Sequence, residues 1–418
     1  MPGFLMQKRA VSFGLLLLLI FGLSGWFGWA PPALALTEEQ KLVSEVWRVV
    51  NRAYVDDSFN GQNWWKIRQE ALRQPLDSRE AAYDTIEEML AKLDDPFTRL
   101  LRPDNYRNLQ VNTAGELTGV GLQIAVESER KRIKVIAPIA GSPADEAGIQ
   151  AGDIVLEIDG VSTENLSLDE AATRMRGTIG TSVVLGVQRL ETNEIDDIEI
   201  IRDRIALNPV SYNLTMAEDS TPIGYIRLTQ FSANATEQMT DAITHLEDEG
   251  ASAYILDLRN NPGGLLQAGV EIARLWLNDA TIVYTVNRQA VLGSFDAGHE
   301  ALTEAPLVVL VNQGTASASE ILAGALQDNR RARLVGERTF GKGLIQSLFD
   351  LSDDSGIAVT VAKYETPSHK DINKLGITPD FVVPQNPISR EEVGTPADMP
   401  YQKAIELLTD SAVVAKAA

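Results

Sequence analysis

The stretch LVVLVNQGTASASEILAGALQ, residues 307–327, decides the fold class of this chain. Its first five residues are all leucine or valine, which is typical of a short strand buried on both faces. Apolar residues at helical spacing follow from Ala316 to Gln327, after a short turn. A buried strand that leads directly into a helix is the unit from which layered α/β cores are built.

The same alternation extends over residues 223–384. Hydrophobic periodicity predicts further strands and helices on both sides of the opening stretch. The expected strands are 225–228, 254–258, 332–335, 344–348 and 357–362, and the expected helices are about 234–249 and from the turn at 261–264 to about 278. We therefore predict an α/β core that occupies residues 204–418.

Two regions of different character precede this core. Apolar residues recur at helical spacing between residues 38 and 101, so we expect a helical N-terminal region at 36–112. Residues 113–203 contain several short alternating strands around one helix, which Ser167 caps and which ends near Met175. This pattern predicts a small β-rich binding module inserted between the helical region and the core.

The N-terminus has the features of an export signal. Lys8 and Arg9 precede an uncharged stretch at 10–30, and Ala33-Leu34-Ala35 has the small-x-small pattern of a signal-peptidase site. We expect residues 1–35 to be a signal peptide and the mature chain to begin at Leu36. An uncleaved membrane anchor is the alternative, because 21 uncharged residues are long enough to span a bilayer. Either reading places the rest of the chain outside the cytoplasm.

Composition excludes several kinds of chemistry. The chain has 58 acidic and 37 basic residues, a formal net charge of −21, so nucleic acid is not an expected partner. It has no cysteine, which excludes disulfides, thiolate catalysis and cysteine-bound zinc. The three histidines do not stand at metal-ligand spacing, and we expect neither a metal nor another cofactor.

Ser317 is a candidate nucleophile. It lies at the turn between the buried strand and the helix, where free N–H groups and the positive end of the helix dipole favour a developing oxyanion. The competing interpretation is structural, because Ser317 and Glu320 also have the spacing of a helix capping box. From this segment alone, both readings stay open.

A serine nucleophile requires a base. His245, His299 and His369 lie in a charged helix or in polar loops, where a solvated histidine is the simpler reading. Burial lowers the pKa of a lysine, so a lysine can take the role of the base. Lys342, between two glycines in Gly336-Glu-Arg-Thr-Phe-Gly-Lys-Gly343, is the candidate, although an ordinary loop lysine would look the same in isolation.

The same segment nearly matches a nucleotide-binding P-loop. Position 343 is glycine where that motif requires serine or threonine, and a strand-like segment follows where a helix is required. The sequence therefore argues against an NTPase.

Six ordered motifs make the chain resemble the C-terminal processing peptidases, also called tail-specific proteases, and within them the cyanobacterial and plastid branch. These are residues 94–101 (DDPFTRLL), 115–122 (GELTGVGL), 257–264 (DLRNNPGG), 315–320 (TASASE), 336–343 (GERTFGKG) and 376–380 (GITPD). The resemblance covers essentially residues 36–410. It implies an endopeptidase with a crotonase-like (ClpP-like) α/β core, an N-terminal helical cap and an inserted PDZ domain at 113–203.

The resemblance also implies a Ser–Lys dyad. It places the nucleophile on Ser317 and the base on Lys342. A glutamine four residues after the base falls on Gln346, and positions four apart on a strand point the same way, so we expect Gln346 to bind the lysine amine.

The resemblance implies two backbone donors for the oxyanion, the N–H groups of Ala318 and of Gly263. Gly264 is the alternative to Gly263. Glycine in this turn lets the backbone approach the scissile carbonyl without a side chain in the way. Asp328 matches an acidic position of the family, and its role is either catalytic or structural.

Residues Gly119, Val120, Gly121 and Leu122 resemble the carboxylate-binding loop of PDZ domains. A substrate tail would bind there as an added strand, which would explain how a peptidase selects chain ends. Arg176 matches an arginine that in some relatives links the PDZ domain to the active site, and a surface salt bridge is its plainer reading.

The expected partners are proteins or peptides with free C-termini, and the membrane enters only through the precursor's signal segment or through membrane-bound substrates. The expected location is the thylakoid lumen or the periplasm, and one candidate reaction is maturation of a photosystem II reaction-centre protein precursor. Two alternatives are a non-catalytic PDZ adaptor, which would lack Ser317 or Lys342, and a crotonase-like acyl-coenzyme A enzyme, which an exported chain with a PDZ domain does not fit.

Overall fold

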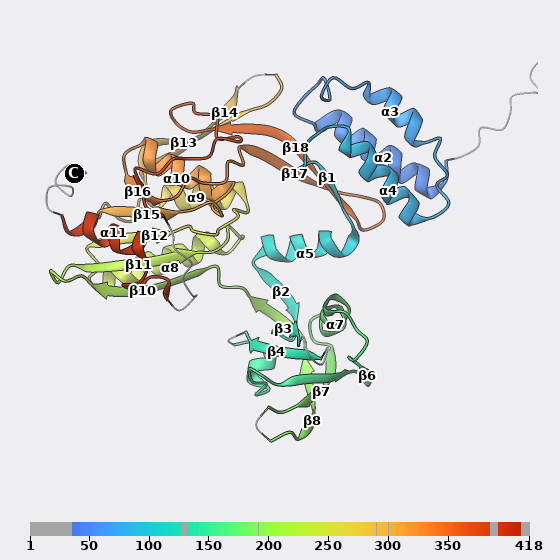
Figure 1. The fold of residues 1–418 in the computed structure, drawn as a ribbon, viewed down its shortest axis with the longest axis horizontal. Coiled ribbons are helices and arrows are strands. Elements are labelled where there is room, and N and C mark those ends of the chain that lie inside the picture. Colours follow the sequence, from blue (N-terminus) through green and yellow to red (C-terminus); the bar gives the residue numbers. More distant parts are fainter. Residues whose placement is uncertain are drawn as a thin grey trace, which may run out of the picture.

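The computed structural model describes residues 36–127, 132–139, 141–190, 192–289, 291–299, 301–384 and 392–410. The expected signal peptide at 1–35 lies outside the described residues. Figure 1 shows three parts: a helical region, a small β-rich module and a larger α/β core.

The N-terminal region contains three helices, α2 (Glu38–Ala53), α3 (Trp64–Ala71) and α4 (Arg79–Ala91). Each begins after a polar residue, Thr37, Asn63 or Ser78, whose side chain accepts a hydrogen bond from an N–H of the first turn. Their buried faces form a separate hydrophobic cluster that includes residues of the hairpin β17 (Leu344–Asp350) and β18 (Gly356–Glu365). The helical region is therefore packed on the core through this hairpin.

A short connection follows the helices. β1 (Arg99–Leu101) pairs with β18, and α5 (Pro103–Ala114) leads to β2 (Glu116–Gly119). β2 pairs with β9 (Asp203–Ala206) in a two-stranded ribbon, which carries the chain into and out of the β-rich module (Figure 1).

The β-rich module has one sheet with the order β3-β4-β5-β7-β8, and β6 pairs with β5. Its apolar residues form a hydrophobic cluster of their own. The expected helix is present as α7 (Leu168–Met175), and the Ser167 capping box is formed. The remaining elements are β3 (Leu122–Val126), β4 (Ile133–Pro138), α6 (Pro143–Glu146), β5 (Ile154–Ile158), β6 (Val161–Ser162), β7 (Ser182–Gln188) and β8 (Ile195–Ile201).

Within the described residues, the core sheet has the order β10-β11-β12-β15-β16-β19. All neighbours are parallel except the antiparallel pair β10–β11. The strands are β10 (Val210–Met216), β11 (Pro222–Leu228), β12 (Ala253–Asp257), β15 (Leu307–Val311), β16 (Ala332–Gly336) and β19 (Phe381–Val382). The central strand β15 is buried along its whole length, as its apolar sequence predicts.

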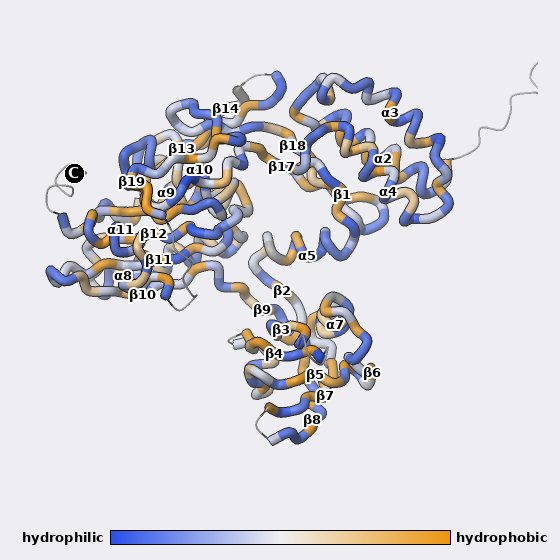
Figure 2. The backbone as a smooth tube through the Cα atoms, viewed as in Figure 1, coloured by the Kyte–Doolittle hydropathy of each residue, from blue (hydrophilic) through white to orange (hydrophobic). Residues whose placement is uncertain are grey.

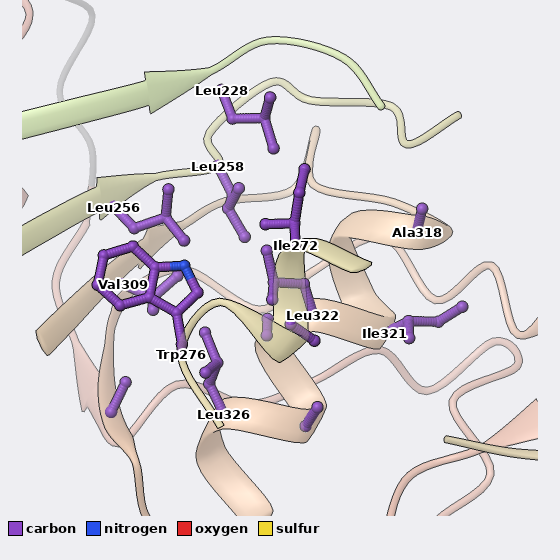
Figure 3. Close-up of a cluster of buried hydrophobic side chains, with 14 of the residues drawn as sticks. Leu228, Leu256, Leu258, Ile272, Trp276, Val309, Ala318, Ile321, Leu322 and Leu326 are labelled. Carbon is purple, nitrogen blue, oxygen red and sulfur yellow. The ribbon is translucent and has the colours of Figure 1, made fainter. Parts of the chain in front are cut away.

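Helices cover both faces of this sheet. α8 (Ala235–Asp248), α9 (Leu266–Arg274) and α10 (Ala318–Asp328) share a hydrophobic cluster with one face, and α11 (Met399–Thr409) packs on the other. Figure 3 shows the first cluster, where Leu322 and Leu326 of α10 lie on the side of Trp276 and Ala318 stands at the start of that helix. This packing fixes the position of the α10 N-terminus.

A second sheet has the order β1-β18-β13-β14, with β17 paired to β18. Its hairpin β13 (Asn278–Val286) and β14 (Val291–His299) corrects one expectation, because the helix predicted to reach about residue 278 ends at Arg274. Trp276 and Leu277 are buried in the core, and the β-branched run that follows favours a strand.

Figure 2 shows hydrophobic segments mainly inside each part, with hydrophilic ones on their outer turns and helix faces. Across the residues that the structure describes, none of the helices combines the length and the hydropathy needed to cross a membrane.

Candidate active site

Ser317 stands at a sharp elbow between β15 and α10. Its backbone has φ 59° and ψ −119°, in a region that a residue with a side chain rarely adopts. Such strain persists only where surrounding structure enforces it, and it is concentrated at functional sites. The sequence prediction of a serine at a strand-to-helix turn is therefore matched by an unusual conformation at that residue.

The first turn of α10 leaves one N–H group unused. The N–H groups of Ser319 and Glu320 donate to the carbonyls of Ala316 (3.2 Å) and Ser317 (2.8 Å), and that of Ser317 donates to the Glu320 carboxylate (2.9 Å). Within the described residues, the N–H of Ala318 has no acceptor in the structure. A free N–H next to the serine is the donor that an oxyanion requires.

The turn at residues 260–264 is bonded directly to this elbow. The carbonyl of Asn261 accepts the Ala316 N–H and the Ser319 hydroxyl, both at 3.0 Å, and the Thr315 hydroxyl donates to the Leu258 carbonyl at 2.9 Å. The expected glycine turn and the expected serine elbow, more than 50 residues apart in the chain, are therefore one rigid unit.

Gly263 faces Ser317 in this unit. A Cβ atom at Gly263, whose φ is +97°, would lie 2.7 Å from the Ser317 Cβ and 2.9 Å from the Ala318 nitrogen, so no larger residue fits. The Gly263 N–H, however, donates to Asn261 Oδ1 at 2.9 Å. No acceptor for the Gly264 N–H is found among the described residues. Of the two glycines, Gly263 therefore lies against Ser317, and Gly264 is the one without an acceptor for its N–H group in the part of the chain that the structure describes.

Glu320 joins the serine elbow to the loop of Lys342. Its side chain is completely buried. One carboxylate oxygen accepts the N–H groups of Ser317 (2.9 Å) and Lys342 (2.8 Å), and the other accepts the Gly341 N–H (2.7 Å) and the Thr339 hydroxyl (2.5 Å). The sequence identified Glu320 only as a capping-box partner. Its contacts with residues 339–342 could not be predicted, because that loop is about 20 positions away in the chain.

Tyr364 of β18 makes a second link between the same two segments. Its buried hydroxyl lies 3.1 Å from the Ser317 carbonyl oxygen and also contacts the Lys342 carbonyl. Burial and the nearby Glu320 carboxylate raise the pKa of Tyr364 well above its ordinary value, so it is a neutral donor. Sequence patterns gave no signal for this contact.

The amine of Lys342 lies in a partly buried position. Its Nζ stands 5.1 Å from the centre of the Phe97 ring. Burial, followed by the positive charge of Arg99, lowers the pKa of Lys342 below its ordinary value, while Glu320 and Asp95 act in the opposite direction. A lowered pKa is the property that a lysine base requires.

Among the described residues, no hydrogen bond joins the Gln346 side chain to the Lys342 amine. The Gln346 amide nitrogen is buried and has no hydrogen-bond partner among the described residues. Lys342 precedes the first residue of β17, and a β-bulge lies between Ile345 and Gln346, so the simple alternation assumed for positions four apart does not hold.

Asp328 has a structural position at the C-terminal end of α10. Its carboxylate accepts the Ser368 N–H (3.0 Å) and hydroxyl (2.6 Å) and pairs with Lys370 (3.1 Å). Burial opposes its ionisation, but these hydrogen bonds outweigh that effect and lower the pKa of Asp328. These contacts favour the structural alternative, in which Asp328 anchors the loop at 366–370.

The three histidines are exposed and each is beside a carboxylate. His245 lies 3.4 Å from Glu249, and His299 lies 3.3 Å from Asp279. His369 lies 3.0 Å from Glu365 and stacks on Tyr284. Each histidine therefore contacts a carboxylate on the protein surface, and none of these contacts involves Ser317.

Replacing His245, His299 and His369 together by glutamine should leave peptidase activity within about twofold of the parent enzyme, since exposed ion pairs contribute little to stability. Steady-state cleavage of a peptide by the folded triple variant measures this. A folded but inactive variant would show that the base is a histidine.

The turn at residues 260–264 rests on a buried charge network. The Arg259 guanidinium binds Asp257 (2.6 Å) and Asp398 (2.7 Å), and the Tyr225 hydroxyl donates to Asp257 at 2.7 Å. All three charged side chains are essentially inaccessible to solvent. Such a network is stable only when every partner is present, so it holds the turn in one position.

The loop at residues 119–122 contains two glycines with positive φ values. Gly119 and Gly121 have φ values of 152° and 83°, and Val120 is buried. A Cβ at Gly121 would lie 2.3 Å from that of Ser142, which explains the requirement for glycine. Leu122 begins the edge strand β3, next to which α7 packs.

Arg176 contacts the connection rather than the serine elbow. Its guanidinium donates to Asn108 Oδ1 of α5 at 2.9 Å. The β-rich module thus contacts α5, the helix that follows β1. Among the described residues, no contact joins Arg176 to Ser317 or Lys342.

Comparison with known proteins agrees with this geometry. The sequence matches peptidase family S41 over residues 222–383 and a PDZ domain over residues 134–189. It is 59% identical over 411 residues to a carboxyl-terminal-processing protease of Synechocystis sp., covering 98% of this chain and 96% of that protein. It is 45% identical over 368 residues to the chloroplastic carboxyl-terminal-processing peptidase 2 of Arabidopsis thaliana, covering 85% and 71%.

The solved structure of a photosystem II D1 C-terminal processing protease has a TM-score of 0.56 and 40% identity, covering 90% of this chain and 99% of that one. An α/β core with a serine elbow and an inserted PDZ domain defines a serine-type peptidase. The chain belongs to peptidase family S41 and, within it, to the carboxyl-terminal-processing proteases. The resemblance found in its motifs is thereby confirmed.

Proposed function

We propose that this protein is a Ser–Lys endopeptidase that cleaves near the C-terminus of exported or lumenal proteins. The observation that carries the proposal is the buried carboxylate of Glu320, which binds the backbone of both Ser317 and Lys342. Incubating the purified protein with candidate precursors and identifying the products by mass spectrometry tests it. Cleavage confined to C-terminal tails is the expected result.

In the proposed reaction, the Ser317 hydroxyl attacks the scissile carbonyl while the neutral Lys342 amine accepts its proton. The N–H groups of Ala318 and Gly264 stabilise the oxyanion. The Lys342 ammonium then gives its proton to the leaving amine, and a water molecule, activated by the same lysine, hydrolyses the acyl-enzyme.

The PDZ domain supplies the recognition step in this proposal. A free C-terminal carboxylate would bind the N–H groups of the loop at 119–122, and the tail would add to the edge strand β3. The core is of the crotonase-like (ClpP-like) type, and the D1-processing relative suggests a photosystem II precursor as one substrate. The thylakoid lumen and the periplasm are the compartments that fit an exported chain.

Amidating the C-terminus of a peptide substrate should lower kcat/KM about 10- to 100-fold. The amide lacks the negative charge, and a charge-assisted hydrogen bond contributes about 1.5–3 kcal/mol. Parallel progress curves for the free acid and the amide measure the ratio. A variant with its PDZ domain deleted between residues 119 and 203 provides the control, since it should treat both peptides alike. Equal cleavage of both peptides by the intact enzyme would exclude carboxylate anchoring.

A further inference from the structure

The N-terminal helical region contributes a segment to the surroundings of Lys342. This segment is residues 95–99, which follows α4 and ends at Arg99, the first residue of β1, more than 240 positions before Lys342 in the chain. The Phe97 ring lies under the lysine amine at 5.1 Å, within the range of a cation–π interaction. The Ser–Lys dyad proposed above does not by itself require any residue from this region.

The segment is held rigidly against the core. Asp95 accepts the Phe97 N–H (3.0 Å) and the Thr98 hydroxyl (2.7 Å), and that hydroxyl accepts the Thr360 N–H (3.0 Å) of β18. Arg99 then pairs with Ala358 in the β1–β18 ladder. Phe97 therefore has a fixed place relative to the strand whose Tyr364 contacts the Lys342 carbonyl.

We propose that residues 95–99 belong to the active site, where the Phe97 ring holds the Lys342 ammonium group and Arg99, fixed two residues further on by its pairing with Ala358 of β18, places a second positive charge in the same segment. The two residues act as positioning residues, through Lys342, and neither exchanges a proton with the substrate. This proposal rests on the proposed role of Lys342 as base. It gives the helical region a chemical function in addition to its packing on the β17–β18 hairpin.

Phe97 and Arg99 should act on the pKa of Lys342 in opposite directions. Within the described residues, the Phe97 ring lies next to the Lys342 amine, the charges of Arg99, Glu320 and Asp95 act on it, and the neutral Tyr364 hydroxyl contacts the Lys342 carbonyl. The face of an aromatic ring stabilises an ammonium group, so Phe97 favours the protonated lysine. The Arg99 charge destabilises the same form, which agrees with the direction in which it moves the pKa of Lys342.

The acid limb of the pH profile of kcat/KM reports the pKa of the base in the free enzyme. Phe97→Leu keeps the apolar surroundings but removes the ring, so the limb should move to lower pH by about half a unit. Arg99→Gln removes the opposing charge, so the limb should move to higher pH by about the same amount. The substrate is one short peptide with a free C-terminus, used for all variants.

Three controls separate this effect from damage to the fold. Phe97→Tyr and Arg99→Lys keep the ring and the charge, so their limbs should stay at the parent position. Arg107→Gln removes an exposed arginine paired with Asp104 on α5 and should also leave the limb in place. Shifts of opposite sign for Phe97→Leu and Arg99→Gln support the proposal.

Two results would overturn it: both limbs unmoved, or both moved in the same direction, as a general loosening of the site would produce. Lys342→Ala distinguishes failure of this inference from failure of the proposed function. If Lys342→Ala is inactive while both limbs stay fixed, the dyad stands and the role of residues 95–99 is wrong. If Lys342→Ala retains activity, the dyad itself is wrong.

Discussion

Ser317→Ala and Lys342→Ala should each reduce kcat at least about 1000-fold, because the reaction loses its nucleophile or its base. Both variants should keep the parent fold. The backbone of Ser317 carries its contacts to the Glu320 carboxylate and to the first turn of α10, and the Lys342 side chain is only partly buried. Single-turnover cleavage assays, with circular dichroism to confirm folding, measure both effects.

Lys342→Arg is the sharper control. Its guanidinium keeps the positive charge and much of the side-chain volume but does not lose a proton at working pH. It should therefore be as inactive as Lys342→Ala. Activity in the arginine variant would mean that Lys342 acts only by its charge and that another group removes the serine proton.

Glu320→Gln should lower kcat about 10- to 100-fold with a smaller change in KM. The carboxylate accepts four hydrogen bonds, two at each oxygen, and the amide nitrogen of glutamine would have to face two of those donors. The Ser317 elbow and the Lys342 loop would then separate, and a displacement of about 1 Å can cost 100-fold in rate. Initial rates across substrate concentrations separate kcat from KM.

Glu320→Ala should also destabilise the protein, by about 2–3 kcal/mol, because buried donors lose their acceptor. Glu237→Gln is the matched control: Glu237 also lies in the first turn of a helix, α8, but is exposed. It should change neither rate nor thermal stability measurably. A Glu320→Gln enzyme with the parent kcat would show that the carboxylate is not needed to align the two loops.

The local elements were predictable because their signals are local. Strand β15 and helix α10 follow from an apolar run and helical spacing. The predicted end of α9 was wrong. Packing of Trp276 and Leu277 in the core, and not helix propensity, decides where the helix ends.

The sequence by itself determined the family, the serine elbow and the lysine loop, because each depends on a short motif whose residues are consecutive. Tertiary structure decided how these motifs meet. Glu320 binds Lys342, which lies 22 positions further along the chain, Tyr364 adds a contact from β18, and Phe97 reaches Lys342 from another region. Burial of a charge and the direction of a backbone N–H depend on the complete fold. For this reason the hydrogen bond that occupies the Gly263 N–H and the lowered pKa of Lys342 are visible only in the structure.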